Sequence, residues 1–387
     1  MPRVFVTDGH WRKTLAVVRS LGRRGVEVTV GESSRVATSL FSKYCSRRVV
    51  YPSVRRHPEA FLTFLRQELK EIPYDLVIPM EEETLLLLAQ HREEFAPLVR
   101  LPIPPYQAIA RVRDKGWLLR HASQQGIPIP QTSWVEDMAN LNTIKDAIPP
   151  PWVIKPRVSS GSFGIAYVER EEDLSEAYRK VHSQFPFPLV QERIPPEGEA
   201  FGVSALLDHK GQVKACFVHR RLREYPITGG PSTLRESVRY PQIEELGIQL
   251  LQSLAWYGVA MVEFKVDPRD NQPKLMELNP RFWGSLALAI HAGVDFPYLL
   301  YKMAMGEEFE AIREYEVGAR CRWLLPGDIL HFLTNPKRFH LQPSFFQFRG
   351  TADDILSMDD PLPAVGTFLT LFALPWDKDL RRFLKRR

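Results

Sequence analysis

The chain has 387 residues, more than one ordinary hydrophobic core holds, so two or three domains are expected. Its 44% hydrophobic and 25% charged residues are typical of a globular protein and exclude a disordered or fibrous one. No stretch reaches the roughly 20 apolar residues that span a bilayer, and the first residues lack the pattern of a signal peptide. The net charge of +5 fits an anionic small-molecule substrate, and we expect no nucleic-acid partner.

Three cysteines, Cys45, Cys216 and Cys321, lie far apart in the sequence. An odd, sparse set without metal-ligand spacing argues against a disulfide framework and against a zinc site. We therefore expect a protein of the reducing cytoplasm.

Strand and helix patterns alternate over the first hundred residues, in the order strand 3–7, helix ending near residue 22, strand 26–30, helix 61–69, strand 75–79 and helix 83–91. Such alternation predicts a parallel sheet with helices on both faces. The loop Thr7-Asp8-Gly9-His10-Trp11 after the first strand lacks the G-x-G-x-x-G fingerprint, so no dinucleotide site is expected there. A Rossmann-like domain that is structural or holds a substrate is favoured.

Two proline-rich segments divide the rest of the chain: residues 101–106 (LPIPPY) and residues 126–130 (GIPIP). We place a domain boundary near residue 105. From residue 130 to about residue 310, longer hairpins alternate with helices, which indicates an α+β unit. The predicted domains are residues 1–105, residues 106–310, and a C-terminal extension of unknown role over residues 311–387.

The strongest chemical signal lies in residues 258–285. Two strand-like runs, 260–267 and 274–279, flank a turn centred on Asp270. Pairing the runs about this turn places Phe264 opposite Met276 and Glu263 opposite Glu277.

The period of two in a strand puts Glu263, Glu277 and Asn279 on one face of this hairpin. Two carboxylates facing each other across strands repel, and a divalent cation between them would reverse that effect. Mg²⁺ accepts carboxylate and amide oxygens, and Arg281 just beyond could bind phosphate. A magnesium site is favoured over the alternative, a polar face that is merely solvated.

The segment Met276 to Arg281 (MELNPR), together with Glu263 in VEF, is similar to the metal hairpin of the ATP-grasp enzymes. Within that superfamily the chain looks most like carboxylate–amine ligases with a core like that of carbamoyl-phosphate synthetase. The resemblance covers roughly residues 1–310. It implies a Rossmann-like (pre-ATP-grasp) α/β domain followed by a two-lobed α+β ATP-grasp domain, with a small lobe over about residues 125–195 and a large lobe over about residues 196–310.

Two lysines match the phosphate-binding lysines of the family: Lys115 in Asp114-Lys115, and Lys155 at the end of the strand-like WVIK. Residues 159–164 (SSGSFG) resemble the glycine-rich flap over the triphosphate, in which glycines let backbone N–H groups approach anionic oxygens. The residues carried over from this flap are Ser160, Gly161, Ser162 and Gly164.

The segment from Leu189 to Glu199 matches the hinge between the two lobes. The resemblance implies that the backbone of Glu192, Arg193 and Ile194 reads the adenine edge, and that the carboxylate of Glu199 holds the ribose hydroxyls.

Taken together, these matches imply an ATP-dependent ligase that converts a carboxylate into an acyl phosphate and then joins it to an amine or a thiol. Glu263, Glu277 and Asn279 would hold Mg²⁺, which Mn²⁺ could replace, while Arg281 and Asn279 would stabilise the acyl phosphate. The expected partners are a small carboxylate, an amine and a second copy of the chain in a homodimer. The alternatives are a bicarbonate-using or purine-biosynthesis ATP-grasp enzyme and a non-catalytic ATP-binding regulatory protein.

Substrate selection is less sharply predicted. Arg221 and Arg223 could bind a substrate carboxylate or could cover a solvated strand, with neither favoured. Gly284 and Ser285 open a predicted helix and could bind an anionic group at its N-terminus. The basic, amphipathic chain end is expected to dock on the protein's own surface, with contact to a membrane surface as the less favoured alternative.

Overall fold

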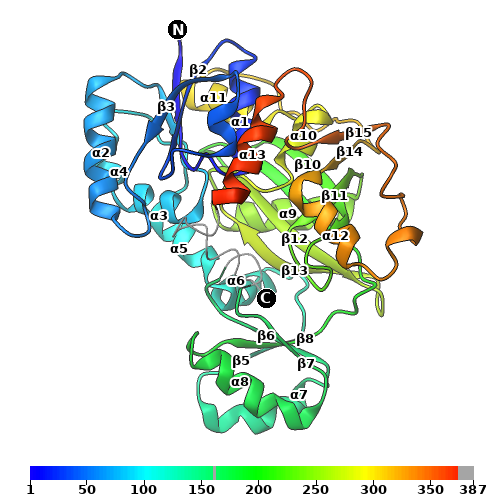
Figure 1. Cartoon of the computed structure of the whole chain (residues 1–387). Helices are drawn as coiled ribbons and strands as arrows, with labels where there is room; N and C mark the ends of the chain where they lie inside the picture. The colour runs from blue at the N-terminus through cyan, green and yellow to red at the C-terminus, as the bar shows by residue number, and fades with distance from the viewer. Residues whose placement is uncertain (160–162, 374–387) are drawn as a thin grey trace.

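The computed structural model describes residues 1–159 and 163–373. Its strands form three sheets, which Figure 1 shows as an N-terminal unit, a large central sheet, and a smaller sheet at the bottom of the view. Among the described residues no helix is long and apolar enough to cross a membrane. The predicted flap residues Ser160, Gly161 and Ser162, and the amphipathic stripe at the chain end, lie outside the described residues.

The N-terminal sheet is parallel, with the strand order β3-β2-β1-β4. Alternate residues of β1 pack on opposite sides: Val4 and Val6 join the core around α1, whereas Phe5 joins the core around α2 and α3. Both faces are therefore covered, which is why β1 is apolar throughout. The elements of this unit are β1 (Arg3–Val6), α1 (Arg12–Gly22), β2 (Glu27–Glu32), β3 (Cys45–Val50), α2 (Pro58–Glu71), β4 (Leu76–Ile78), α3 (Glu82–Gln90) and α4 (Arg92–Phe95).

The sequence predicted each of these strands except β3. That strand lies at the edge of the sheet, and its segment Ser46-Arg47-Arg48 is exposed. Arg47 pairs with the buried Glu68 of α2, so its charge serves to hold the edge strand to the helix. Exposed charges are common on edge strands, and here they conceal the hydrophobic periodicity that identifies the other strands.

The small sheet is antiparallel, with the order β5-β8-β6-β7, and α7 and α8 cover it. Two helices, α5 and α6, connect it to the N-terminal unit. The bounds are α5 (Tyr106–Arg113), α6 (Lys115–Gln124), β5 (Thr132–Trp134), α7 (Ile144–Ala147), β6 (Trp152–Lys155), β7 (Ala166–Val168), α8 (Leu174–His182) and β8 (Leu189–Glu192).

The large sheet has the order β13-β12-β9-β10-β11-β14-β15 and is antiparallel except for the last pair. Apolar residues of β9, β10 and β12 alternate between a core shared with α9 and one shared with α10 and α11. The bounds are β9 (Ala200–Leu207), β10 (Val213–Glu224), β11 (Ser232–Ser237), α9 (Pro241–Ser253), β12 (Gly258–Asp267), β13 (Gln272–Asn279), α10 (Leu286–His291), α11 (Phe296–Met305), β14 (Arg320–Arg322) and β15 (Thr351–Asp353).

The β12–β13 hairpin pairs Val262 with Leu278 and Glu263 with Glu277, as predicted. The predicted pairing of Phe264 with Met276 is wrong, because a register shift after Glu263 places Phe264 opposite Leu275. Leu275 consequently points into the core instead of the polar face. A bulge of this kind inserts an unpaired residue, which an expectation of strict alternation does not foresee.

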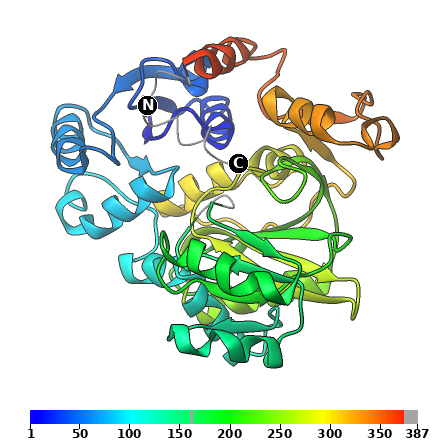
Figure 2. The ribbon, with the colours of Figure 1, turned by 60° about the horizontal axis from the view of Figure 1, so that its bottom comes forward.

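Residues beyond 310 do not form a separate layer. The strand β14 pairs with β11, so the large sheet continues past the position at which we expected the lobe to end. After α12 (Ile329–Thr334), the chain crosses to the N-terminal unit, where α13 (Leu362–Ala373) packs on the short helix Thr38–Phe41. Figure 2 shows this crossing from the large sheet to the first sheet.

Candidate functional site

The paired carboxylates of the β12–β13 hairpin, Glu263 and Glu277, lie close to side chains that donate hydrogen bonds. Arg221 Nη2 donates to Glu263 Oε2 at 3.0 Å, and Asn279 Nδ2 donates to Glu263 Oε1 at 3.2 Å. Burial raises the pKa of Glu263; the guanidinium of Arg221 opposes this effect, and the charge of Glu277 adds to it. Arg221 thus offsets part of the charge of the two acids, to which a cation would add.

Lys115 approaches the same acids from α6. Its ammonium donates to Ser159 O at 2.5 Å and lies 3.8 Å from Glu277 Oε2. Asp114 fixes the start of this helix: its side chain accepts the N–H groups of residues 116 and 117 and binds Arg157 Nη2 at 2.6 Å. The N-cap carboxylate thus orients Lys115, and it provides a physical reason for the Asp-Lys pair.

Lys155 ends β6, where the predicted buried strand delivers it towards the hairpin. Its pKa is lowered to about 8, chiefly by burial and also by the charge of nearby Lys115, while the charge of Glu277 opposes this shift. Within the described part of the chain the Lys155 ammonium has no hydrogen-bond or salt-bridge partner. A desolvated, unpaired ammonium is a strong attractor for an anionic oxygen.

A small polar pocket lies where these elements meet. Its walls come from α3, α5, α6, the start of the flap and β13, and its lining includes Glu82, Arg113, Lys115, Ser159, Glu277 and Asn279. Carboxylate oxygens and ammonium groups face one space between the small and large sheets. Such a set can hold a divalent cation and a polyphosphate together.

A metal ion bound by protein side chains alone is not indicated here. In residues 1–159 and 163–373, no cluster of three or more His, Cys, Asp or Glu side chains has metal-binding geometry. The hairpin offers two carboxylates and one amide oxygen as ligands. The amide oxygen of Asn279 is available because its amide nitrogen donates to Glu263. This set fits Mg²⁺ that takes its remaining ligands from phosphates and water.

The predicted hinge follows β8. The Glu192 side chain is 8% exposed and is engaged by Gln131 N at 2.9 Å, Arg269 Nη2 at 2.6 Å and Lys274 Nζ at 3.1 Å. The side chain is therefore not available to a ligand, and the backbone N–H of Glu192 donates to Gln131 O at 2.9 Å. Arg193 N already donates to Pro151 O at 2.9 Å, and Lys265 Nζ donates to Ile194 O at 3.5 Å.

Glu199, predicted to hold a ribose, is half-exposed. Arg220 Nη1 donates to its Oε1 at 2.7 Å, which leaves Oε2 for a hydroxyl donor. Gly164, at the end of the flap, has a φ of +78°, and a Cβ there would approach Phe185 to 2.6 Å. Its requirement for glycine is thus conformational and steric.

Arg223 does not reach the acids. Its guanidinium is 4% exposed and forms two hydrogen bonds of 2.9 Å with Asp328, so the prediction that it binds a substrate is not supported. A register shift in β10 between Arg221 and Arg223 separates the two arginines. Arg221 is left on the side of Glu263.

The prediction of an anion site at Gly284 and Ser285 is wrong. The helix α10 has six residues, Ser285 is 3% exposed, and its hydroxyl lies 3.1 Å from His219 Nε2. Arg12 Nε donates a hydrogen bond to the carbonyl oxygen of Gly284 at 2.8 Å. Both residues are structural.

Arg281 lies beyond the hairpin and lines a second pocket with Pro79, Pro102 and Phe282. One of its donors, Nη1, binds the carbonyl of Phe282 at 3.0 Å, while the buried Nε has no partner. The structure brings Arg281 to the wall formed by the N-terminal unit, and leaves a donor available there.

Sequence reasoning did not include Asp114, Arg157 and Ser159, which fix or contact Lys115, among the site residues. Lys265 was placed on the polar face of the hairpin but given no role, although burial lowers its pKa and it contacts Ile194 O. Its position two residues after Glu263 on the same face was the available signal.

The paired acids and the two lysines, Lys115 and Lys155, form a charge pattern that is compatible with a bound nucleotide triphosphate. Residues 184–325 match the family described as ATP-grasp in the biosynthetic pathway with Ter operon. Over this part of its length the chain is similar to the ATP-grasp superfamily.

Three relatives illustrate the likeness. The carbamoyl phosphate synthase large chain of Thermomicrobium roseum is 23% identical over 255 residues, which are 63% of this chain but only 24% of the relative. The biotin carboxylase domain of Hydrogenobacter thermophilus 2-oxoglutarate carboxylase, solved as a dimer with MgADP and bicarbonate, has a TM-score of 0.68 and 17% identity over 82% of this chain and 73% of the other. L-amino acid ligase from Bacillus licheniformis has a TM-score of 0.61 and 20% identity over 79% and 74%.

Proposed function

We propose that this protein is an ATP-dependent ligase that activates a small carboxylate as an acyl phosphate and joins it to an amine. The observation that carries the proposal is that Lys115, Glu277 and Asn279 line one polar pocket. Glu263 is hydrogen-bonded to Asn279, and Lys155 is close enough for its charge to interact with Lys115 and Glu277. This pairing of oxygen ligands with ammonium groups matches the charge pattern of Mg-ATP.

In the first step, a substrate carboxylate oxygen attacks the γ-phosphorus of ATP, the bond to the β-phosphate oxygen breaks, and ADP leaves. Lys115 and Lys155 neutralise the phosphate oxygens, and Glu263, Glu277 and Asn279 would hold Mg²⁺, or Mn²⁺ in its place, which would supply further neutralisation of the phosphate charge. In the second step, the amine attacks the acyl carbon, inorganic phosphate leaves, and the amine nitrogen loses a proton. A thiol could replace the amine as nucleophile.

The remaining assignments follow from the fold. The resemblance assigns the backbone of residues 192–194 to the adenine edge and Glu199 Oε2 to a ribose hydroxyl, which the hydrogen bond from Arg220 to Oε1 leaves free to accept. Arg221, 3.0 Å from Glu263, and Arg281, with its unpaired Nε, neutralise the substrate carboxylate and the acyl phosphate. Positioning and charge neutralisation account for the catalysis, as in phosphoryl transfer generally.

The first 105 residues act in this proposal as the Rossmann-like wall of the cleft, followed by an ATP-grasp domain over residues 106–310. The polar pocket supports this arrangement because Glu82 of the N-terminal unit lines it together with β13. The homodimer and the cytoplasmic location belong to the same proposal.

A bicarbonate-using reaction is the second candidate, because solved relatives include a biotin carboxylase domain bound to bicarbonate. The experiment that separates the two measures ADP release with Mg-ATP over a panel of amino acids, dipeptides and bicarbonate, and identifies products by mass spectrometry. Stimulation by an acid together with an amine, with a new amide product, supports the ligase. Stimulation by bicarbonate alone selects the carboxylase, and tight Mg-ATP binding without ADP release across the panel would make the protein a non-catalytic regulator.

A further inference from the structure

Large apolar side chains are exposed mainly in the last part of the described chain. More than half of the large apolar residues that the structure exposes come after residue 330, although those residues are a small part of the chain. All but Leu356 and Met358 belong to two places, α13 and the segment of residues 332–348, which we term the aromatic loop. Single exposed apolar residues need no explanation, but a gathering of them does.

The helix α13 packs with its small residues against the protein and its large apolar residues towards solvent, which is the reverse of the usual arrangement. Its inner face carries Gly366 and Thr367, and a Cβ on Gly366 would come within 2.6 Å of Phe41. Its outer face presents Val365, Phe368 and Phe372, which are 48%, 56% and 78% exposed. The small residues thus serve docking on the N-terminal unit, and the large apolar ones face away from the protein.

The aromatic loop is built in a similar way. Phe332 and Phe345 stack with ring centroids 4.4 Å apart and form its base. Around them Phe339, Phe346 and Phe348 are 72%, 64% and 53% exposed. The stacked rings of Phe332 and Phe345 support the exposed rings around them. The exposure therefore follows from the way the loop packs.

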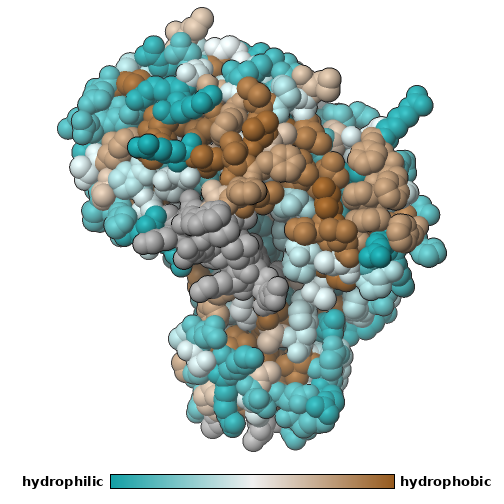
Figure 3. Space-filling view, in the orientation of Figure 1, coloured by the Kyte–Doolittle hydropathy of each residue, from teal (hydrophilic) through white to brown (hydrophobic). Residues whose placement is uncertain are grey.

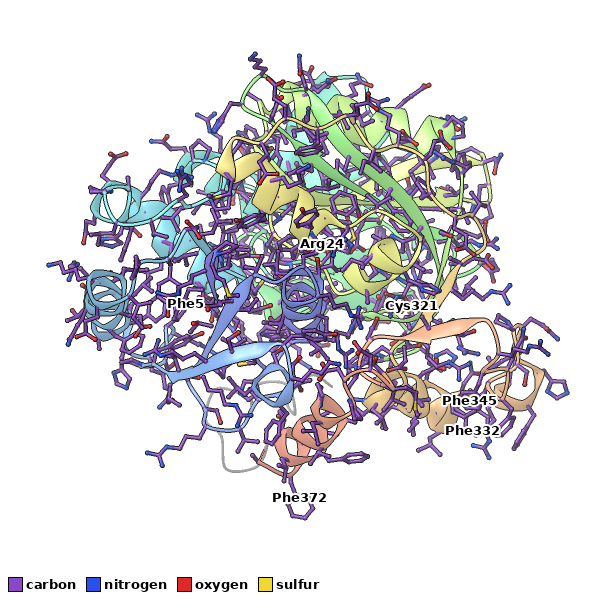
Figure 4. All side chains as sticks on the ribbon, turned by 90° about the horizontal axis from the view of Figure 1, so that it is seen from above. Phe5, Arg24, Cys321, Phe332, Phe345 and Phe372 are labelled. Carbon is purple, nitrogen blue, oxygen red and sulfur yellow. The ribbon has the colours of Figure 1, made fainter. Side chains whose placement is uncertain are left out.

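The two places share one side of the molecule. In the space-filling view, apolar colour runs over α13 and over the segment that follows α12 (Figure 3). Seen from above, Phe372 and the pair Phe332 and Phe345 lie along the same edge (Figure 4). We call this combined surface the apolar face.

The apolar face is cationic and carries no free acid. Residues 331–350 contain no Asp or Glu, and Lys337, Arg338 and Arg349 are exposed there. α13 has no charged residue, and residues 374–387, which continue from it, hold six Lys or Arg against two Asp.

Four aspartates lie between the loop and the helix, and all are engaged with partners. Asp354 pairs with Arg235, Asp360 with Arg19 at 2.9 Å and Asp359 with Lys43 at 2.6 Å. Asp353 accepts backbone N–H groups at distances of 2.7 to 3.1 Å. None of these acids is left to offset the exposed cations.

From this combination we propose that the apolar face lies on the surface of an acidic lipid bilayer, with the phenylalanines entering the headgroup boundary and the cations among the lipid phosphates. Aromatic and basic residues on one exposed surface are the chemistry that such binding requires. A second copy of the chain is a poorer occupant, because a two-fold interface would bring two cationic faces together. The inference does not depend on the proposed ligase activity.

The test uses the full chain and vesicles of two kinds, phosphatidylcholine alone and phosphatidylcholine with an equal part of phosphatidylglycerol. Cosedimentation is expected with the mixed vesicles only, and it should weaken as salt is added. The double variants Phe368→Ser with Phe372→Ser and Phe346→Ser with Phe348→Ser should each bind at least about tenfold more weakly. Reversal of charge at Lys337, Arg338 and Arg349 to Glu should weaken binding similarly.

The matched control is Val50→Ser, which removes an equally exposed apolar side chain from β3 and should leave vesicle binding unchanged. Thermal unfolding checks that every variant folds. Equal binding to both kinds of vesicle, or full binding by the phenylalanine variants, overturns the proposal. If the wild type sediments as a dimer that these variants dissolve, and it ignores vesicles, a second copy covers the face instead.

Discussion

The β12–β13 hairpin and the segment from α12 to α13 distribute polar and apolar groups in opposite ways. In the hairpin, Glu263 and Glu277 face each other in a partly buried cleft, with Lys115 and Arg221 nearby. In the C-terminal segment, Phe346 and Phe372 stand in water while small residues are buried. Both arrangements cost free energy in the isolated chain.

The difference indicates what kind of ligand or surface each region is suited to bind. Buried charges that are only partly paired favour a charged ligand, since a cation or phosphate improves their electrostatics on binding. Exposed phenylalanines favour a nonpolar medium. Charged residues are usually exposed and large apolar residues buried. The cleft departs from the first tendency and the C-terminal segment from the second, which distinguishes a candidate catalytic cleft from a candidate docking surface.

The largest expected effect tests the cleft. Glu277→Ala removes one of two carboxylate ligands and should reduce Mg-dependent ADP release by about 10³-fold, while far-UV circular dichroism stays unchanged. Glu172→Ala, at an exposed position in the small lobe, is the control and should keep full activity. Full activity of the Glu277 variant would remove the metal assignment.

The second prediction separates two arginines on one strand. Arg223→Ala removes two hydrogen bonds from the buried Asp328, which keeps Arg322 at 3.2 Å and the Thr233 hydroxyl at 2.9 Å, so urea unfolding should show a loss of about 2–3 kcal/mol. Arg221→Ala, whose guanidinium lies beside the cleft, should instead lose activity with a smaller loss of stability. Equal effects of the two substitutions on stability would contradict the assignment of Arg221 to the site.

The third prediction concerns the pKa of Lys155, which burial lowers to about 8 in the free protein. A bound triphosphate favours the charged form and raises this pKa towards the ordinary value of about 10.4. Nucleotide binding should therefore take up about half a proton at pH 8, and affinity should fall as pH rises through that range. Calorimetry in buffers of different ionisation enthalpy measures the uptake, and Lys155→Met should abolish it.

The smallest effect belongs to the apolar face. Phe368→Ser combined with Phe372→Ser should change the free energy of unfolding by no more than about 0.5 kcal/mol, because both rings are already in solvent. Phe264→Ser, at a residue 1% exposed in the core of the large sheet, should cost at least about 3 kcal/mol. A large loss from the first pair would mean that α13 buries those rings, contrary to the structure.

Much of the cleft could be predicted locally. The pairing of Glu263 with Glu277 was predicted from a turn centred on Asp270, but in the structure it also depends on the bulge. The turn at residues 268–271 pairs Asp267 with Gln272, and strict alternation from there would place Glu263 opposite Met276. The helix start at Asp114 and the apolar run ending at Lys155 are equally local signals. By contrast, two features were not predicted. The exposed charged residues of the edge strand β3 conceal its hydrophobic periodicity, and the bulge near Met276 shifts the register of the hairpin by one unpaired residue.

The sequence by itself thus placed Glu263, Glu277 and Asn279 on one face of a hairpin from strand periodicity, and its resemblance to the ATP-grasp enzymes added Lys115 and Lys155. Only the tertiary structure decided the use of Arg223, because its partner Asp328 comes 105 residues later in the chain. Only the tertiary structure revealed that α13 turns its glycine inward and its phenylalanines outward, because an apolar helix does not specify which of its faces finds a neighbour.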